Sequence, residues 1–209
     1  MSSIPKPEPA EFRAIQTTAA WSHTLEAFTR WCNPRPGEWV LDIGCGPGKL
    51  PALFSQQGCR ATGIDLDETM FRPVPLYPQV VCGDGLILPF PAHTFDLVTA
   101  SNLLFYLDSP ITALLEMRRV IVPGGRIGLI NPSPRLNASD ATTMAERHHL
   151  QGAARDSLIS WAQRAENHQR WSPEELNQIC GAAGLRLARW EYSVGPGFAL
   201  FAIAQQNDQ

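Results

Sequence analysis

The amino-acid sequence predicts an α/β fold, with a seven-stranded, mostly parallel sheet, an antiparallel last strand and helices on both faces. Two observations carry this prediction. The apolar run Trp39–Ile43 ends abruptly in the glycines of residues 44–48, as a buried parallel strand does where it turns into a helix. Further apolar runs of strand length recur along the chain, and most of them are separated by helical patterns.

Length and composition predict a single globular domain spanning residues 1–209. The net charge of −3 and the pI near 5.9 give no basic surface for nucleic acid. The five cysteines form no C-x-x-C pair, so neither a disulfide framework nor a metal site is expected. No apolar run approaches the length of a membrane span, and the N-terminus has no apolar signal core. We therefore expect no membrane segment and a cytoplasmic location.

The N-terminal part of the chain is predicted to contain one helix before the first strand. Residues 1–10 are rich in proline and are expected to be flexible. Glu11–Cys32 is predicted to be helical because Trp21, Leu25 and Phe28 recur at helical spacing on one face. The prolines that follow end this helix.

The first strand leads into a glycine turn that is typical of a cofactor-binding loop. The segment Val40–Leu50 reads VLDIGCGPGKL. Glycine is needed where the backbone has a positive φ or where a ligand approaches closely, so Gly44, Gly46 and Gly48 are expected to shape a loop against a ligand. A helix is expected to begin near Leu50 and to end at Gly58.

The residues of this turn favour a cationic ligand over a phosphate. The spacing G-x-G-x-G differs from the dinucleotide fingerprint G-x-G-x-x-G. The phosphate-binding G-x-x-x-x-G-K-[ST] pattern fails twice, because Ile43 replaces its first glycine and Leu50 follows Lys49. A carboxylate at Asp42 would repel a pyrophosphate but would attract a sulfonium or an ammonium group.

The second strand adds a ribose-binding group. Ala61–Ile64 is a short apolar run that ends in Asp65, about 20 residues beyond the glycine turn, where an acid accepts hydrogen bonds from ribose hydroxyls. A cofactor with a ribose, a positive charge and no required phosphate is therefore expected, and S-adenosylmethionine has these properties.

Five segments, in this order, carry a family resemblance. They are VLDIGCGPGKL (Val40–Leu50), GIDLDETM (Gly63–Met70), VCGDGLILPFP (Val81–Pro91), FDLVTASNLLFYL (Phe95–Leu107) and RRVIVPGGRIGLI (Arg118–Ile130). In these segments the chain resembles the class I S-adenosylmethionine-dependent methyltransferases, particularly the small-molecule branch that includes ubiquinone and menaquinone methylases. The resemblance implies a Rossmann-like fold and in-line transfer of a methyl group from S-adenosylmethionine to a small-molecule acceptor.

The resemblance also implies which residues contact the cofactor. Asp84 is expected to accept a hydrogen bond from the adenine amino group; its alternative role is to cap local turn amides. Ser101 and Asn102 follow the fourth strand, Phe95–Ala100, at the sheet edge where open α/β sheets bind ligands. The full set of expected cofactor-binding residues is Asp42, Gly44, Cys45, Gly46, Gly48, Asp65, Leu66, Asp84, Gly85, Ser101 and Asn102.

The chain departs from the family pattern after the second strand. The prolines within residues 73–78 disfavour the full helix that relatives place there, so we expect a single turn capped by Asp67 and then an extended crossover. This leaves the adenine side near Leu66 and Met70 more open than usual.

The remaining elements follow from local signals. Ser109–Pro110 predicts a helix start, and Ser172–Glu175 reads as a capping box. The turn Pro123–Gly125 is expected to precede a strand. The strands and helices expected in this part are Gln79–Cys82, Ser109–Val120, Arg126–Ile130, a helix from Ser172 to Gly184, Leu185–Tyr192 and the antiparallel Phe198–Ala204.

Residues 135–170 form an insertion that is too long for an ordinary connection. Helices are expected at Met144–Leu150 and Ser157–Ala165. By resemblance, this insertion shapes the substrate pocket as a lid, with Met144, Trp161 and Trp171 as walls. The N-terminal helix at residues 11–32 is expected to cover the cofactor, through Phe12, Gln16 and Trp21.

No catalytic residue is assigned, because the family shares cofactor motifs and no universal base. Candidates are His148 and His149, of which only one can face a pocket on a helix, and Tyr106. A polar helix surface is the alternative role of both histidines.

Two other functions remain open. A nicotinamide-dependent oxidoreductase shares the strand, the glycine turn and the ribose acid, and a binding or regulatory module would keep the cofactor pocket without turnover. The identity of the acceptor, the atom methylated and the oligomeric state are left open by the sequence.

Overall fold

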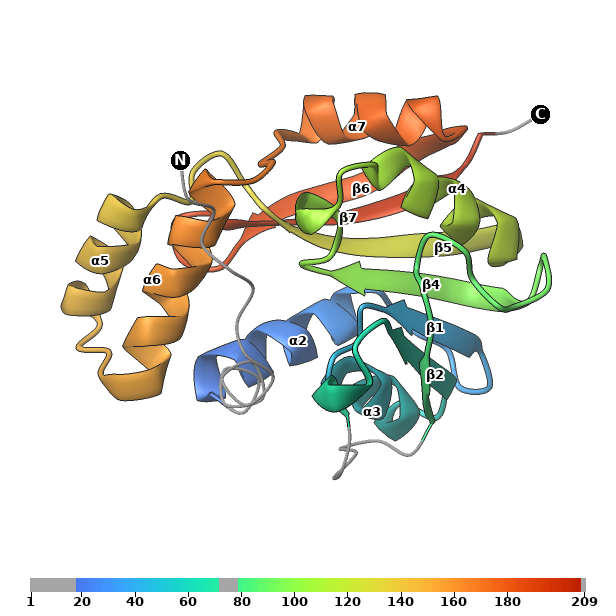
Figure 1. Ribbon diagram of the computed structural model, residues 1–209, viewed down its shortest axis with the longest axis horizontal. Coiled ribbons are helices and arrows are strands. Elements are labelled where there is room, and N and C mark those ends of the chain that lie inside the picture. Colours follow the sequence, from blue (N-terminus) through green and yellow to red (C-terminus); the bar gives the residue numbers. More distant parts are fainter. Residues whose placement is uncertain (1–17, 72–78, 208–209) are drawn as a thin grey trace.

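The computed structural model describes residues 18–71 and 79–207, and they form a seven-stranded sheet in the order β3-β2-β1-β4-β5-β7-β6 (Figure 1). All neighbours are parallel except β7, which is antiparallel to both β5 and β6. The predicted Rossmann-like α/β fold with an antiparallel last strand is therefore confirmed. The strands are β1 (Trp39–Ile43), β2 (Arg60–Asp65), β3 (Val80–Cys82), β4 (Phe95–Ser101), β5 (Ile121–Pro132), β6 (Leu185–Ser193) and β7 (Ala199–Gln206).

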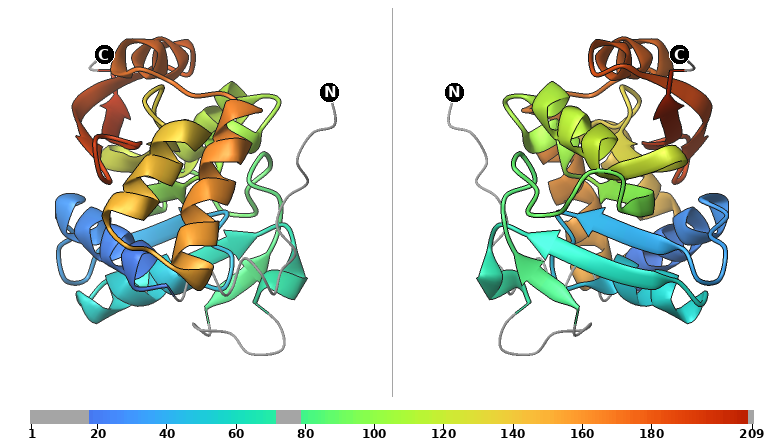
Figure 2. Two further views of the ribbon diagram at one scale, coloured as in Figure 1. Left: turned by 90° about the vertical axis from the view of Figure 1, so that its left-hand side faces the viewer. Right: turned by 90° about the vertical axis from the view of Figure 1, so that its right-hand side faces the viewer.

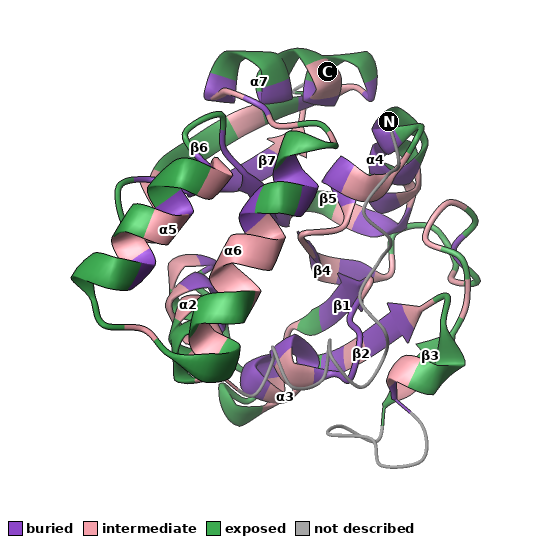
Figure 3. Ribbon diagram, turned by 60° about the vertical axis from the view of Figure 1, so that its left-hand side comes forward, coloured by how far each residue is buried: buried purple, intermediate pink, exposed green. Residues whose placement is uncertain are grey.

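Helices cover both faces of the sheet. On one face lie α4 (Pro110–Val120) and α7 (Pro173–Ala182), on the other α2 (Ala19–Trp31) and α3 (Lys49–Gln56). The inner strands β1, β4 and β7 are mostly buried, whereas the edge strands β3 and β6 and the outward turns of the helices are largely exposed (Figure 3). This is the amphipathic pattern from which helices at the surface of a sheet are expected to form.

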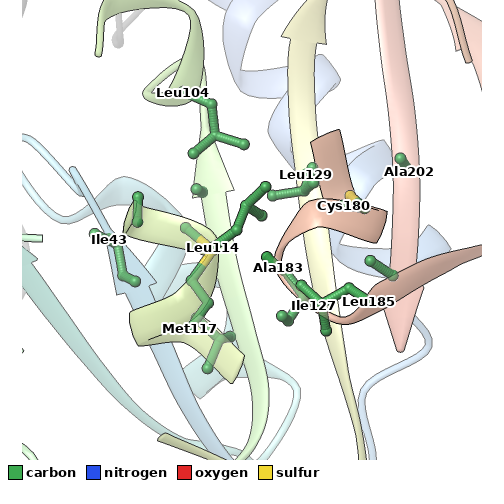
Figure 4. Close-up of a cluster of buried hydrophobic side chains, with 14 of the residues drawn as sticks. Ile43, Leu104, Leu114, Met117, Ile127, Leu129, Cys180, Ala183, Leu185 and Ala202 are labelled. Atoms are coloured by element: carbon green, nitrogen blue, oxygen red, sulfur yellow. The ribbon is translucent and has the colours of Figure 1, made fainter. Parts of the chain in front are cut away.

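The core has one apolar layer on each side of the sheet. On the first side, Leu114 and Met117 of α4 and Cys180 of α7 pack against Ile127 and Leu129 of β5, and all five are fully buried (Figure 4). The second layer joins side chains of α2 and α3 to β4 and β7, among them Leu25, Phe28, Phe54, Leu97 and Phe201. Most of the favourable burial energy of the fold lies in these two layers.

Local signals explain where two of the helices begin. The Ser172 hydroxyl accepts from the Glu175 N–H and the Glu175 carboxylate accepts from the Ser172 N–H, which confirms the predicted capping box. Pro110 is the first residue of α4, as predicted. The Ser109 hydroxyl, however, lies 2.8 Å from the Thr112 hydroxyl and accepts no backbone N–H of the helix.

The connection after β2 begins as the prolines predict. Up to Phe71, where the described residues break off, it holds a single 3-10 turn, η1 (Glu68–Met70), and the Asp67 carboxylate caps this turn by accepting from the Thr69 N–H at 2.9 Å. The predicted extended crossover at residues 73–78 lies outside the described residues. So do the predicted flexible segment 1–10 and the first part of the predicted N-terminal helix, with Phe12 and Gln16; within the described chain this helix is α2.

The predicted start of the fifth strand at Arg126 is wrong. β5 begins at Ile121, which pairs with Phe95, and the next pair is Leu97 with Arg126. Residues 122–125, including the predicted turn, loop out between these two pairs as an irregularity inside the strand. β5 also runs on to Pro132, because its last two residues pair with β7.

The helix boundaries predicted within residues 135–170 are also wrong. The structure has α5 (Ala138–Arg147) and α6 (Gly152–Glu166), which lie side by side at one end of the sheet (Figure 2). α5 begins at Ala138 because the Asn137 side chain accepts from the Asp140 N–H at 2.9 Å. The Glu166 carboxylate accepts from the Ala138 N–H at 3.1 Å, so the two ends of this helical hairpin meet.

Candidate functional site

Two cavities adjoin at the carboxyl ends of the parallel strands, where open α/β sheets bind ligands. The first, of about 280 Å³, we call the acidic cavity. Its lining is Ile43, Gly44, Ile64, Asp65, Leu66, Asp67, Met70, Gly83, Asp84, Gly85, Leu86, Ser101, Asn102, Leu103, Tyr106 and Leu107.

The second cavity, of about 130 Å³, we call the apolar cavity, and it lies between α2, α5 and α6. Its lining is Thr18, Ala20, Trp21, Thr24, Ser101, Asn102, Tyr106, Met144, Leu150, Ala154, Ser157, Leu158, Trp161, Arg164 and Val194. Three residues, Ser101, Asn102 and Tyr106, line both cavities. The two spaces therefore meet just beyond the end of β4.

The Asp65 carboxylate ties the glycine turn to the end of β2. Its Oδ2 accepts from the Gly46 N–H at 2.7 Å, and its Oδ1 accepts from the Asp67 N–H at 3.0 Å. Gly44, Gly46 and Gly48 all have positive φ values, as the sequence predicts for this turn. A side chain at Gly44 would also place a Cβ only 3.0 Å from the Leu103 side chain.

Asp42 lies beneath this turn and does not line the acidic cavity. It is almost completely buried in β1, and the Thr99 hydroxyl donates to its Oδ1 at 2.7 Å. Burial raises the pKa of Asp42 to about 8; the Thr99 hydrogen bond opposes this shift and the charge of Asp65 adds to it. Asp42 is therefore mostly protonated at neutral pH in the protein as it stands.

Sequence reasoning and structure agree on seven lining residues of the acidic cavity and differ on four. Asp42, Cys45, Gly46 and Gly48 do not line it. Asp42 points to Thr99, the buried Cys45 thiol donates to the Gly46 carbonyl, and the Gly46 N–H donates to Asp65. The residues brought together as expected are Gly44, Asp65, Leu66, Asp84, Gly85, Ser101 and Asn102.

Asp84 serves the turn as well as the cavity. Its Oδ1 accepts from the Leu86 N–H at 2.8 Å, which is the turn-capping role, while the side chain remains at the cavity wall. Apolar walls at Ile43, Leu103 and Leu107 were not predicted, because one apolar residue among many in a strand or turn carries no signal of its own.

Asn102 and Trp161 connect β4 to the insertion. The Trp161 indole N–H donates to the Asn102 Oδ1 at 3.2 Å, and the backbone N–H of Asn102 donates to the Ile130 carbonyl at 2.8 Å. The ring of Trp161 also meets that of Trp21 on α2 edge to face, with centroids 6.2 Å apart. The insertion and the N-terminal helix thus close together over the end of β4.

Of the expected cavity walls, Met144, Trp161 and Trp21 line the apolar cavity, but Trp171 does not. Trp171 is only 6% exposed and packs in the core with side chains of α4 and α7. Trp171 lies between the end of the insertion at residue 170 and the start of α7 at Pro173.

The structure places the two histidine candidates away from both cavities. His148 and His149 are exposed and line neither cavity. The reason is that α5 ends at Arg147, so His148 is its C-cap and His149 follows with a φ of 52°. Both side chains therefore lie beyond the C-terminal end of α5 and are exposed.

Tyr106, the third candidate, lies where the two cavities meet. Its ring packs against Phe105 and, with centroids 5.1 Å apart, against His168. Burial raises the pKa of Tyr106, while the positive charge of Arg164 opposes this. The phenol is thus protonated at neutral pH and suited to donate a hydrogen bond.

Arg164 is the one charged residue among the described lining residues of the apolar cavity, and sequence reasoning missed it. It is 5% exposed. Within residues 18–71 and 79–207 no cluster of three or more His, Cys, Asp or Glu side chains is arranged to hold a metal ion. In the same residues, no helix has the length and apolar character needed to span a bilayer.

Comparison with known proteins agrees with this arrangement. A family model described as "Methyltransferase domain" matches residues 41–129. The demethylmenaquinone methyltransferase of Corynebacterium kroppenstedtii is 32% identical over 184 residues, covering 83% of this chain and 79% of that protein.

Solved structures show the same fold. A SAM-dependent methyltransferase from Aquifex aeolicus matches with a TM-score of 0.70 at 18% identity, covering 95% of this chain and 98% of that one. Magnesium protoporphyrin IX methyltransferase from Synechocystis PCC 6803, with bound SAH, matches with a TM-score of 0.66 at 17% identity, covering 95% and 94%.

The family match contains the glycine turn, the acid at the end of β2 and the β4 segment that borders both cavities. Together with the similarity over most of the chain, it favours a methyltransferase over a nicotinamide-dependent oxidoreductase or a non-catalytic binding module. The chain belongs to the class I S-adenosylmethionine-dependent methyltransferases and is an enzyme that uses S-adenosylmethionine as its cofactor.

Proposed function

We propose that this enzyme transfers the methyl group to a small, largely apolar acceptor that binds in the apolar cavity. The observation that carries the proposal is the shared border of the two cavities at Ser101, Asn102 and Tyr106. A donor held on one side and an acceptor held on the other would meet at this border. The demethylmenaquinone methyltransferase name of a relative supports an aromatic acceptor of the hydroquinone type.

The acidic cavity fits the cofactor. Asp65 and Asp84 supply carboxylates for hydroxyl and amino groups, and the Ser101 hydroxyl is buried without a partner among the described residues. A Cβ at Gly85 would lie 2.7 Å from Ile43, so only a glycine leaves this wall open. We propose that Gly44, Asp65, Leu66, Asp84, Gly85, Ser101 and Asn102 hold the cofactor, and that Asp42, Cys45, Gly46 and Gly48 act by shaping the loop beneath it.

The bound cofactor supplies an electrophilic methyl group for an in-line displacement. The residues around it need only exclude water and align the acceptor. Met144, Leu158 and Trp161 give the apolar cavity its dry walls. No histidine and no carboxylate stands among its described lining residues, so we propose that the enzyme works without a general base in this cavity.

A turnover assay tests this proposal. Purified enzyme is mixed with S-adenosylmethionine and 1,4-dihydroxynaphthalene under reducing conditions, and S-adenosylhomocysteine and methylated product are followed by mass spectrometry. Leu158→Gln, in the cavity wall, is expected to lower kcat/KM about tenfold. The matched change Ile159→Gln, at the next position of α6 and outside the lining, is expected to have little effect. Equal activity of both variants would contradict binding of the acceptor in this cavity.

We further propose that residues 1–209 form one methyltransferase domain in which residues 135–170 act as a substrate lid and residues 11–32 as a cover. Because the ends of the α5–α6 hairpin meet at Ala138 and Glu166, a short Gly/Ser linker can replace residues 138–166. Cofactor affinity is expected to stay within about tenfold, or 1.4 kcal/mol, and transfer to be abolished. Normal methyl transfer by the shortened chain would contradict the lid hypothesis. If the shortened chain does not fold, the Leu158→Gln variant provides the test instead.

A further inference from the structure

A buried positive charge lines the apolar cavity without a partner. Arg164 of α6 is 5% exposed, and among the described residues no carboxylate forms an ion pair with it and no hydrogen bond from its guanidinium is found. A guanidinium remains charged at any pH at which the protein is folded. Burying such a charge without an anion is costly, so a site of this kind calls for an anionic partner.

The two acidic side chains of α6 are engaged elsewhere. Glu166, two residues further along α6, accepts from the Ala138 N–H, and Asp156 lies next to Arg155 at the exposed start of the helix. Tyr106 lines the same cavity, and the positive charge of Arg164 opposes the rise in its pKa that burial causes. Among its described lining residues the cavity therefore presents one charged side chain, Arg164, within mostly apolar walls that also carry a few hydroxyl groups and one amide.

From this arrangement we infer that Arg164 binds an oxyanion of the methyl acceptor, so that the acceptor is an apolar, ring-sized molecule with a carboxylate or a similarly acidic oxygen. The inference rests on the proposed function, because it assigns the apolar cavity to the acceptor. The planar guanidinium suits a carboxylate, with which it can form two parallel hydrogen bonds.

The cofactor also has a carboxylate, but the position of Arg164 favours the acceptor. Arg164 lines the apolar cavity and is absent from the acidic cavity, where the glycine turn, Asp65 and Asp84 lie. Its neighbours in the lining, such as Leu158 and Trp161, come from the insertion and not from the cofactor motifs.

Calorimetry with a matched pair of probes tests the inference. 2-Naphthoate and the neutral 2-naphthamide have nearly the same shape, and each is titrated into the full-length enzyme in the presence of S-adenosylhomocysteine. The naphthoate is expected to bind at least tenfold more tightly. Arg164→Met should abolish this preference and Arg164→Lys should keep part of it. Arg155→Met, which removes an exposed arginine of the same helix, should leave the preference intact.

Three results would overturn the inference. They are equal affinity of the two probes for the wild-type enzyme, an unchanged preference in Arg164→Met, and a tenfold loss of S-adenosylhomocysteine affinity in Arg164→Met, which would place the cofactor carboxylate there. Binding of neither probe to the wild type would overturn the proposed acceptor cavity as well. The comparison of the two probes on the wild type needs no variant, so the test stands even if Arg164→Met does not fold.

Discussion

The Thr99 hydroxyl donates to the Asp42 carboxyl at 2.7 Å across the adjacent strands β1 and β4, and both side chains are buried. The two residues are 57 positions apart in the sequence. Their hydrogen bond places a mostly protonated acid directly beneath the glycine turn, between the strand that leads into this turn and the strand that ends at the border of the cavities.

The raised pKa of Asp42 predicts that stability falls as pH rises. In the unfolded chain this carboxyl ionises near 3.8, whereas in the folded protein it keeps its proton up to a pH of about 8. Between these values only the folded state holds the proton, so the free energy of unfolding decreases with increasing pH. Asp42→Asn, which mimics the protonated form, should flatten this decline. Denaturant unfolding at pH 5 and pH 8 measures it.

The exposed change Asp108→Asn is the control and should leave the decline as it is in the wild type. A decline of the same size in Asp42→Asn would show that other groups cause it.

The close packing around Gly63 predicts that substituting this glycine with alanine destabilises the folded protein. A Cβ there would lie 2.6 Å from the Cys45 Sγ and 3.1 Å from Pro51, so the glycine turn or α3 must shift. Gly63→Ala should lower the free energy of unfolding by about 1–3 kcal/mol. Gly181→Ala, on α7 with open space around its Cβ, should instead stabilise by up to about 1 kcal/mol. Chemical denaturation distinguishes the two, and equal effects would contradict the close packing at Gly63.

Replacing Asp65 is expected to lower the affinity for the cofactor for two reasons. Asp65→Ala removes the acceptor of the Gly46 N–H as well as the proposed partner of the ribose. Affinity for S-adenosylmethionine should fall by about 1–3 kcal/mol in calorimetry. Asp96→Ala is a matched control, because Asp96 also accepts a backbone N–H, from Trp39, but lies away from both cavities. Asp96→Ala should reduce stability while leaving the affinity for S-adenosylmethionine unchanged. Wild-type affinity in a folded Asp65→Ala variant would show that Asp65 does not bind the ribose.

Loss of the Trp161–Asn102 hydrogen bond is expected to weaken binding of the acceptor and to leave binding of the cofactor unchanged. Trp161→Phe keeps an aromatic ring against Trp21 but loses the indole donor. One such hydrogen bond contributes about 0.5–1.5 kcal/mol, so the KM for the acceptor should rise roughly two- to tenfold while cofactor affinity stays constant. Trp190→Phe, on the exposed part of β6, should change neither quantity. Weaker cofactor binding in Trp161→Phe would assign this contact to the acidic cavity.

Features governed by neighbours in the sequence could be predicted from it. The glycine turn, the single turn after Asp67 and the capping box at Ser172 depend on a few consecutive residues, and each forms as expected. The start of α5 belongs to the same class, since Asn137 and Asp140 form an N-terminal cap that could have been recognised.

Features governed by contacts between distant residues could not be predicted. Nothing near Asp42 indicates Thr99 as its partner, and nothing near Arg164 indicates that this arginine is buried in a cavity wall. His148 and His149 illustrate the sensitivity to helix boundaries, because α5 ends at Arg147, three residues before the predicted end, and both side chains are therefore exposed.

The position of β7 inside the sheet has a consequence for the order of folding. β7 is the last strand along the chain, yet it lies between β5 and β6, and β6 pairs with no other described strand. While a chain is being synthesised, β6 therefore has nowhere to dock until residues 199–206 have emerged. The β6–β7 hairpin must then join the open edge of β5 as a unit. Until it does, that edge offers unpaired backbone groups on which a chaperone or a second nascent chain can act.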